Sequence, residues 1–196
     1  MKLLKRVAVV VFASAMAQSA WADKLSLADI SSYLNGLKTV EARFTQINDD
    51  GTRDAGTIYI KRPGKMRFEY DPPNSALVVA SANAVYIADK KSNQTPETYP
   101  LRQTPLSIIL ARNVNLSQAK MVVGHDFDGT ATIVTAQDPE NAEYGSIQMK
   151  FTDQPVQLSQ WVINDGNGGQ TTVILGALST GVTLSNRLFN PPSREN

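Results

Sequence analysis

The chain has 196 residues, among them 19 basic residues, 18 acidic residues, one histidine and no cysteine. The lack of cysteine excludes disulfide bonds and thiolate metal sites, so stability must come from packing and hydrogen bonds. The length suits one domain with a substantial hydrophobic core.

Residues 1–22 are predicted to form a secretory signal peptide. Lys2, Lys5 and Arg6 give a basic start, and the apolar run 7–17 is too short to cross a bilayer as an ordinary helix. Small residues at the cleavage positions follow in Ala20-Trp21-Ala22. Since no cysteine follows the apolar run, the protein is not expected to be a lipid-anchored lipoprotein. We expect a soluble protein outside the cytoplasm, in a bacterial periplasm.

Without this segment the chain is a predicted single domain of 174 residues, 23–196. The segment holds three basic residues and no acidic ones, so 16 basic and 18 acidic residues remain. The resulting net charge of −2 argues against nucleic acid as a partner.

Two segments are predicted to be helical. In the first, residues 26–37, Leu27, Ile30, Leu34 and Leu37 recur at helical spacing, and Ser26 precedes them as an N-cap. In the second, residues 104–111, Thr104 is the predicted cap and Pro105 the first helical residue, with Leu106, Ile109 and Leu110 on one apolar face.

Almost everything else is predicted to form strands. Apolar and polar residues alternate through 65–70 and 146–151, and clusters of Gly, Asn, Asp and Pro mark the turns between candidate strands. The predicted strands are 40–47, 54–61, 65–70, 76–80, 84–88, 119–125, 130–137, 146–151, 156–164, 170–177 and 182–189.

About ten alternating strands indicate an antiparallel sheet with one wet face. A sheet of that size tends to curl or to split into packed layers. Two helices cannot cover both faces, so one solution is a curled sheet, an incomplete barrel, with the helices over its apolar concave side. A β-sandwich with peripheral helices is the alternative, and the pattern alone does not decide between them.

The sequence offers little for catalysis or metal binding. His125 stands near Asp126 and Asp128, but a metal site normally needs more histidine or cysteine, and a strand leading into a turn explains the segment. The acidic run 48–51 lacks the spaced oxygen ligands of a calcium loop, and the glycine-rich run 165–169 lacks the lysine of a phosphate loop. We predict no cofactor, no metal and no catalytic residues.

Arg62 is the most informative single residue. It shares strand parity with Ile58 and Ile60, so an unbroken strand would place it on the apolar face. A guanidinium among apolar groups is costly unless acceptors are supplied. A solvated arginine at a strand end is the alternative.

Several motifs occur in an order that resembles the LolA family of periplasmic lipoprotein carriers. They are Phe44-Thr45-Gln46, Gly56, Lys61-Arg62-Pro63, Pro73, Leu77-Val78, the helix from Thr104-Pro105 to Ala111-Arg112-Asn113, and Phe189-Asn190-Pro191-Pro192. Together they cover nearly all of the chain after the signal peptide. The family resemblance implies an incomplete antiparallel barrel of 10–11 strands, closed by a helical lid around an apolar cavity.

The resemblance also implies a function and its site. A carrier of this family takes acylated lipoproteins from an ATP-driven (ABC-type) exporter in the inner membrane and passes them to a receptor at the outer membrane. Arg62 matches the arginine that hydrogen-bonds to the lid in the closed, empty state, a lid latch. We also expect a monomer. The expected acyl-chain cavity residues, which would otherwise be ordinary core, are Leu27, Ile30, Leu34, Phe44, Ile58, Ile60, Met66, Phe68, Tyr70, Leu106, Ile109, Leu110, Ile147, Met149, Phe151 and Trp161.

Two other functions remain open at this point. A periplasmic lipid or lipoprotein sensor that regulates a membrane partner could use the same half-barrel, although such sensors usually carry a second domain. An enzyme acting on lipids or the cell wall is the third possibility, against which stands the lack of an evident nucleophile and base pair.

Overall fold

The computed structural model describes residues 23–118 and 120–192, so the predicted signal peptide lies outside the described residues. Its main feature is one antiparallel sheet in the order β6-β5-β4-β3-β2-β1-β11-β10-β9-β8-β7, with β12 pairing β1. The strands are β1 (Thr39–Ile47), β2 (Arg53–Lys61), β3 (Lys65–Tyr70), β4 (Ala76–Ser81), β5 (Ala84–Asp89), β6 (Glu97–Pro100), β7 (Val122–Phe127), β8 (Thr132–Gln137), β9 (Ser146–Thr152), β10 (Gln157–Asn164), β11 (Gln170–Leu175) and β12 (Ser179–Thr180). The helices are α1 (Leu27–Gly36), η1 (Leu101–Gln103), α2 (Leu106–Leu110), η2 (Ala142–Tyr144) and η3 (Asn186–Phe189).

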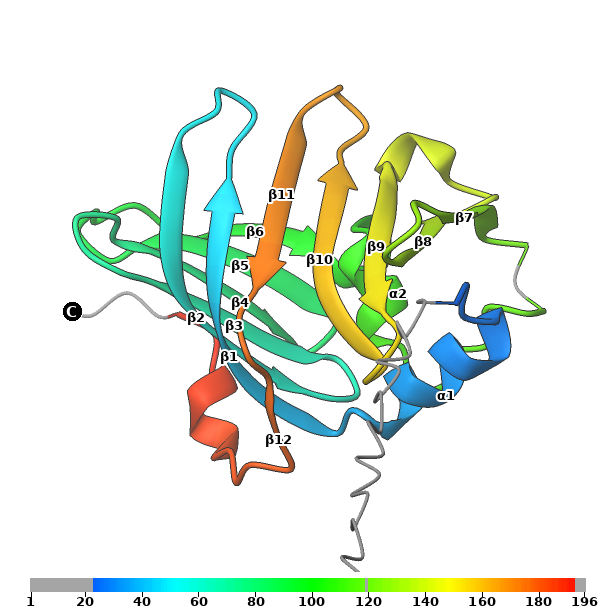
Figure 1. Ribbon diagram of the computed structural model, residues 1–196. Helices are drawn as coiled ribbons and strands as arrows, with labels where there is room; N and C mark the ends of the chain where they lie inside the picture. Colours follow the sequence, from blue (N-terminus) through cyan, green and yellow to red (C-terminus); the bar gives the residue numbers. More distant parts are fainter. Residues whose placement is uncertain (1–22, 119, 193–196) are drawn as a thin grey trace, which may run out of the picture.

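The sheet is strongly curved, with the long strands β1, β2, β11 and β10 crossing in front of β3 to β6 (Figure 1). Because β6 and β7 end the strand order without pairing each other, the sheet is open and does not close into a barrel. The predicted incomplete antiparallel barrel with two helices is therefore confirmed. The β-sandwich alternative is wrong, since all strands belong to a single sheet.

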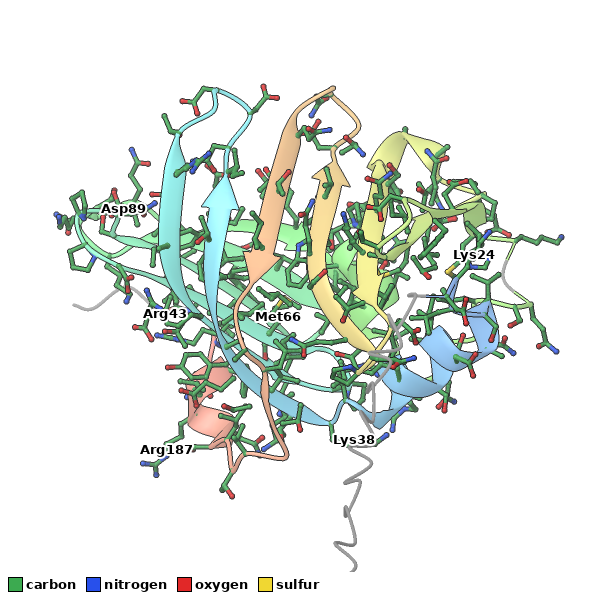
Figure 2. All side chains as sticks on the ribbon, viewed as in Figure 1. Lys24, Lys38, Arg43, Met66, Asp89 and Arg187 are labelled. Carbon is green, nitrogen blue, oxygen red and sulfur yellow. The ribbon has the colours of Figure 1, made fainter. Side chains whose placement is uncertain are left out.

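Alternation along the strands explains which face is buried. In β3 and β9 every second residue is buried or, at Tyr70, half-buried, and these residues point to the concave side. Figure 2 shows Met66 in the interior, whereas Lys38, Arg43 and Asp89 lie at the outside. The apolar parity of the strands therefore fixes the concave side as the core side.

Helix α1 begins where the sequence predicts. The side chain of Ser26 accepts a hydrogen bond from the backbone N–H of Asp29 and donates to the Asp29 carboxylate, at 3.1 and 2.6 Å. Helix α2 begins differently from the prediction. Pro105 is its N-cap residue, and the Thr104 hydroxyl donates backward to the carbonyl of Leu101 instead of capping α2. The Thr104 hydroxyl is therefore bonded to η1 and does not cap α2.

Ten of the eleven predicted strands are present, and one prediction is wrong. Residues 182–189 contain no strand, because Ser185 caps the short helix η3. Two strands escaped prediction. All four residues of β6 are exposed, and the strand ends at a proline, which suits an edge strand. β12 has only two residues.

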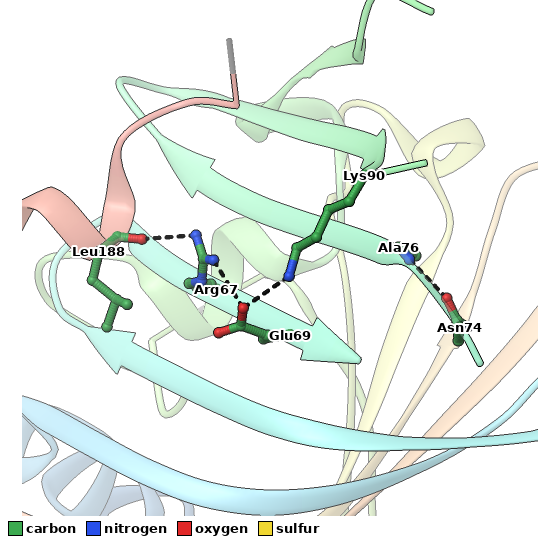
Figure 3. A network of polar contacts seen from close by, with 6 residues as sticks. All are labelled: Arg67, Glu69, Asn74, Ala76, Lys90 and Leu188. Atoms are coloured by element: carbon green, nitrogen blue, oxygen red, sulfur yellow. Dashed lines mark hydrogen bonds and ion pairs between the residues drawn. The ribbon is translucent and has the colours of Figure 1, made fainter. Parts of the chain in front are cut away.

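The C-terminal segment packs on the outer side of the sheet. Phe189 is almost fully buried, and the outward-facing Leu77 and Val79 of β4 are buried outside the main core cluster. Lys61 and Arg67 donate from the outer face to the carbonyls of Leu184 and Leu188, at 2.7 and 3.2 Å. Figure 3 shows the Arg67 contact together with the ion pairs that link Glu69 to Arg67 and Lys90. A second, smaller apolar cluster thus fastens residues 184–189 to the convex face.

A substitution at Gly56 of β2 can test how tightly the concave face is packed. It pairs with Phe44 of β1, whose ring lies over it, and a Cβ there would lie 2.7 Å from that ring and overlap the main-chain oxygen of Glu69. We expect Gly56→Ala to lower the free energy of unfolding by about 3 kcal/mol, because backbone must move to relieve the overlap. Urea denaturation of both proteins measures the change.

Gly36→Ala is the matched control. A Cβ at Gly36 meets nothing within 4 Å, so this variant should keep the stability of the native protein or gain up to about 1 kcal/mol. Equal stability of the two variants would show that the close approach over Gly56 is not a packing constraint.

Candidate functional site

The concave face and the helices enclose one continuous apolar interior. All sixteen expected cavity residues belong to a single hydrophobic cluster, fourteen of them buried and Leu27 and Tyr70 partly buried. The strands supply most of them, and α1 and α2 supply the rest from the other side. The structure therefore brings together residues that are up to 134 positions apart in the chain, from Leu27 to Trp161.

Four aromatic side chains form a group within this interior. Phe44 packs edge to face against both Phe68 and Tyr70, with ring centroids 5.2 Å apart in each pair. Phe68 also meets Trp161 at 6.3 Å and 83°. Such edge-to-face pairs are favoured by the ring quadrupoles, and they give the interior a large polarisable surface.

Several interior residues were missed by the sequence reasoning. Val134, Leu158 and Val173 are buried in the same cluster on β8, β10 and β11, and the alternation of their strands could have identified them. Leu116 is buried as well, but it lies in a loop without periodicity, so no sequence signal marks it.

The helices and the loop after α2 form one hydrogen-bonded unit, residues 27–36 and 101–116, which we call the lid. The Asn35 side chain donates to the carbonyl of Val114 and accepts from its N–H, at 2.8 and 2.9 Å. The hydroxyl of Ser31 accepts from the N–H of Leu116 at 2.9 Å. These contacts tie α1 to the loop that follows α2, so the two helices are linked to each other as well as to the sheet.

A few polar contacts join the lid and the residues before it to the sheet. The hydroxyl of Tyr33 accepts a hydrogen bond from the N–H of Leu158 at 3.0 Å. Burial raises the pKa of Tyr33, and the bond from Leu158 partly offsets that rise. Just before α1, Leu25 donates its N–H to Thr132, and its carbonyl lies 2.9 Å from Nε2 of His125. His125 of β7 and Thr132 of β8 thus hold the residues just before α1 on the sheet.

Arg62 lies at the rim where α2 meets the sheet. Its Nη2 donates to the carbonyl of Ala111, the C-cap residue of α2, at 2.5 Å. The turn between β2 and β3 makes a second contact with the end of α2, since the N–H of Gly64 donates to the carbonyl of Leu110 at 3.0 Å. Carbonyls at a helix C-terminus lack partners within the helix and carry partial negative charge, which suits a guanidinium. Burial lowers the pKa of Arg62 from its ordinary value, so this guanidinium is less well solvated than a surface arginine.

A groove of about 670 Å³ opens beside this contact. Three cationic residues and no acidic residue occur among those that line it. The lining residues are Pro63, Gly64, Lys65, Ala82, Asn83, Pro100, Leu101, Arg102, Ser107, Leu110, Ala111 and Arg112. The groove therefore borders both the lid and the turns of the sheet.

A polar network lies near the aromatic group, at one end of the concave face. The Tyr70 hydroxyl donates to Gln46 at 2.7 Å, Gln46 donates to Asn48 at 2.6 Å, and the Asp54 carboxylate accepts from Asn48 and Asn74 at 2.8 and 2.7 Å. Burial raises the pKa of Tyr70 to about 12, and the charge of Asp54 adds to that rise. The interior is thus apolar in its body and polar along this border.

The described residues, 23–118 and 120–192, contain no group of three His, Cys, Asp or Glu side chains placed to hold a metal ion. Within the same ranges, no helix is both long and apolar enough to cross a membrane. What the arrangement offers chemically is an apolar interior under a cover held by a small number of hydrogen bonds.

Comparisons with known proteins identify the family to which the chain is similar. A family model described as "Outer membrane lipoprotein carrier protein LolA" matches residues 35–192. The chain is similar to the outer-membrane lipoprotein carrier protein of Pseudomonas aeruginosa strain PAO1, at 22% identity over 96% of this chain and 94% of the relative. The corresponding protein of Azotobacter vinelandii is 23% identical, over 92% of this chain and 89% of the relative.

One solved structure supports the fold. A domain from Vibrio parahaemolyticus, assigned to outer membrane lipoprotein sorting, matches with a TM-score of 0.51 and covers 84% of this chain and 94% of its own. Because the two sequences are only 9% identical, this likeness shows a shared fold and nothing more.

The link between Asn35 and Val114 can be tested directly. Asn35→Asp removes the donor to the Val114 carbonyl and sets a carboxylate against it, so the free energy of unfolding should fall by about 1–3 kcal/mol. Because the lid is one unit, amide hydrogen exchange should rise together in α1 and in residues 106–116. Exchange mass spectrometry on peptides from both segments measures this.

Asn115→Asp serves as the control, since the Asn115 side chain is exposed and bonds only locally to Gln118. It should change stability by no more than about 0.5 kcal/mol. Faster exchange in α1 alone after Asn35→Asp would contradict the description of the lid as one unit.

Proposed function

The chain belongs to the LolA family of outer membrane lipoprotein carrier proteins, and from this premise we propose that it carries lipoproteins across the periplasm. It binds their acyl chains in the apolar interior, keeps them out of water, and releases them at the outer membrane. The observation that carries the proposal is a large apolar concave face covered only by a small lid with few polar attachments.

Magnitudes explain why acyl chains need such a carrier. Each buried methylene is worth about 0.8 kcal/mol, so a triacylated anchor with roughly 45 methylenes carries about 35 kcal/mol of unfavourable exposure in water. An anchor of this kind does not cross an aqueous space unaided. The sixteen cavity residues offer it an apolar surface, provided that the lid moves away, because in the closed state their own side chains fill the interior.

Arg62 sets the balance between the closed and open states in this proposal. A hydrogen bond from a charged donor contributes about 1.5–3 kcal/mol, which is small beside the burial energy of an acyl anchor. The bond therefore does not prevent cargo from entering. It does favour the closed, empty state by roughly ten- to hundredfold, so that reclosure of the lid assists the release of cargo.

The proposal extends to location, partners and reaction. The protein acts in the periplasm after loss of its signal peptide, as a monomer and without catalysis. It receives cargo from an ABC-type exporter in the inner membrane, which supplies the energy, and delivers it to an outer-membrane receptor that binds the acyl chains more tightly. An ordered series of affinities then makes transport directional.

Release of lipoprotein from membranes tests the function. Spheroplasts or inner-membrane vesicles carrying a labelled triacylated lipoprotein and an active exporter are mixed with residues 23–196. We expect the label to appear in a soluble one-to-one complex. A stable complex with a regulatory membrane protein, without release of label, would favour a lipid or lipoprotein sensor instead. Hydrolysis of acyl esters, abolished by His125→Ala, would indicate an enzyme.

Arg62→Leu should separate the loading of cargo from its delivery. The variant lacks the bond to Ala111, so the closed state loses its advantage and the open state is more populated. The apparent affinity of the protein for cargo therefore rises. We expect release from spheroplasts to continue, while transfer to outer-membrane vesicles falls at least tenfold. Label is counted in both fractions.

Arg53→Leu is the matched control, because Arg53 is an exposed arginine at the start of β2 and outside the lid. It should load and deliver cargo as the native protein does. Normal delivery by Arg62→Leu would refute the role of Arg62 as a latch and leave the carrier function intact.

A further inference from the structure

Trp161 carries a buried polar group without a partner. The side chain lies in β10 with none of its surface exposed, and its Nε1–H makes no hydrogen bond. Among the described residues, the other buried side-chain nitrogens without partners are Nε of Arg62 and Nε of Arg67. Both arginines bond through their other nitrogens, whereas an indole has a single donor and nothing else to offer.

The surroundings of Trp161 explain its burial but not its N–H. Met149 and Val173 are its register partners on β9 and β11, and the ring meets Phe68 at close to a right angle. An aromatic face is a much weaker acceptor than a carbonyl oxygen. Phenylalanine would fill such a site without a polar group, so an unpaired indole is costly in the empty protein.

An acylated ligand has the complementary need, an acceptor that lacks a donor. Its methylenes need no polar partner, but each chain ends in an ester or amide carbonyl, and burying that oxygen without a donor is also costly. We infer that the Trp161 Nε1–H donates to an acyl carbonyl oxygen of the bound cargo. This inference rests on the proposed carrier function, because it supplies the ligand, and it deepens that function by fixing where the head end of a chain lies.

The position of Trp161 in the sheet supports this orientation. Val173 is paired with Trp161 on one side and with Gln46 on the other, so Trp161 and Gln46 lie two strands apart on the same face, about 10 Å. Gln46 belongs to the polar network with Tyr70. A carbonyl at Trp161 would place the polar part of the lipid toward this network and would direct the hydrocarbon toward the lid.

Nuclear magnetic resonance provides the test. The sequence contains two tryptophans, and residues 23–196 retain only Trp161, so its indole gives one cross-peak in a ¹H–¹⁵N spectrum. The first probe is a synthetic peptide on an S-(2,3-diacyloxypropyl)cysteine with a free amine. The second replaces both esters by ethers, and the third adds an N-acyl amide to the ether form.

Each probe gives a distinct result. A downfield shift of the indole proton with the ester probe, absent with the ether probe, assigns an ester carbonyl as the acceptor. A shift with the third probe assigns the amide carbonyl. Uptake of all three probes without any shift overturns the inference and leaves the proposed function standing. Failure of every probe to bind overturns both.

A replacement without the N–H gives a second measure. Exchange of Trp161 for β-(3-benzothienyl)alanine keeps the bicyclic shape and removes the donor. This protein should bind the ester probe about three- to tenfold more weakly than the native protein, and the ether probe equally well. Trp161→Phe should show the same loss of preference for ester over ether. If the amide is the acceptor, the same comparison is made between the third probe and the ether probe. An unchanged preference for the probe that carries the assigned carbonyl, in both variants, would overturn the inference.

Discussion

The structure depends on one constraint: the curved sheet has an apolar concave face that must be kept from water, and little chain is available to cover it. Helix α1 has ten residues and α2 has five. The alternation of apolar residues along the strands produces the apolar face. The cover depends on individual contacts. Asn35 joins α1 to the loop after α2, and the bonds of Tyr33 and Arg62 join the lid to the sheet. This small number of contacts links the fold to the proposed carriage of acyl chains, in which a ligand that buries a comparable apolar surface displaces the cover.

Most of the sheet could be predicted because its signal is local. Alternation in β3 and β9, and the turn residues between strands, identified ten strands and the side on which their apolar residues lie. The same reasoning failed for residues 182–189. Leu184 and Phe189 of this segment are buried on the outer face, where Leu77 and Val79 provide a second cluster that no local pattern reveals. The polar edge strand β6 gave no apolar signal at all.

The candidate site could be predicted only in part, for the same reason. Strand parity indicated that Arg62 faces the apolar side, and helical spacing indicated which residues of α1 and α2 do so. The bonds that join the parts of the lid connect positions about 80 residues apart, such as Asn35 with Val114. Nothing in either local sequence marks the other as its partner. The unpaired N–H of Trp161 likewise becomes visible only when every neighbour of the ring is known.

The open edges of the sheet have a mechanical consequence. In a closed barrel the hydrogen bonds run all the way round, so strand number and stagger fix the circumference. Here β6 and β7 end the ladder without pairing each other, so no closed ring of hydrogen bonds fixes the circumference. Strand pairing therefore does not fix the width of the interior. For the proposed carrier, strand pairing therefore sets no single width that every acyl anchor must match.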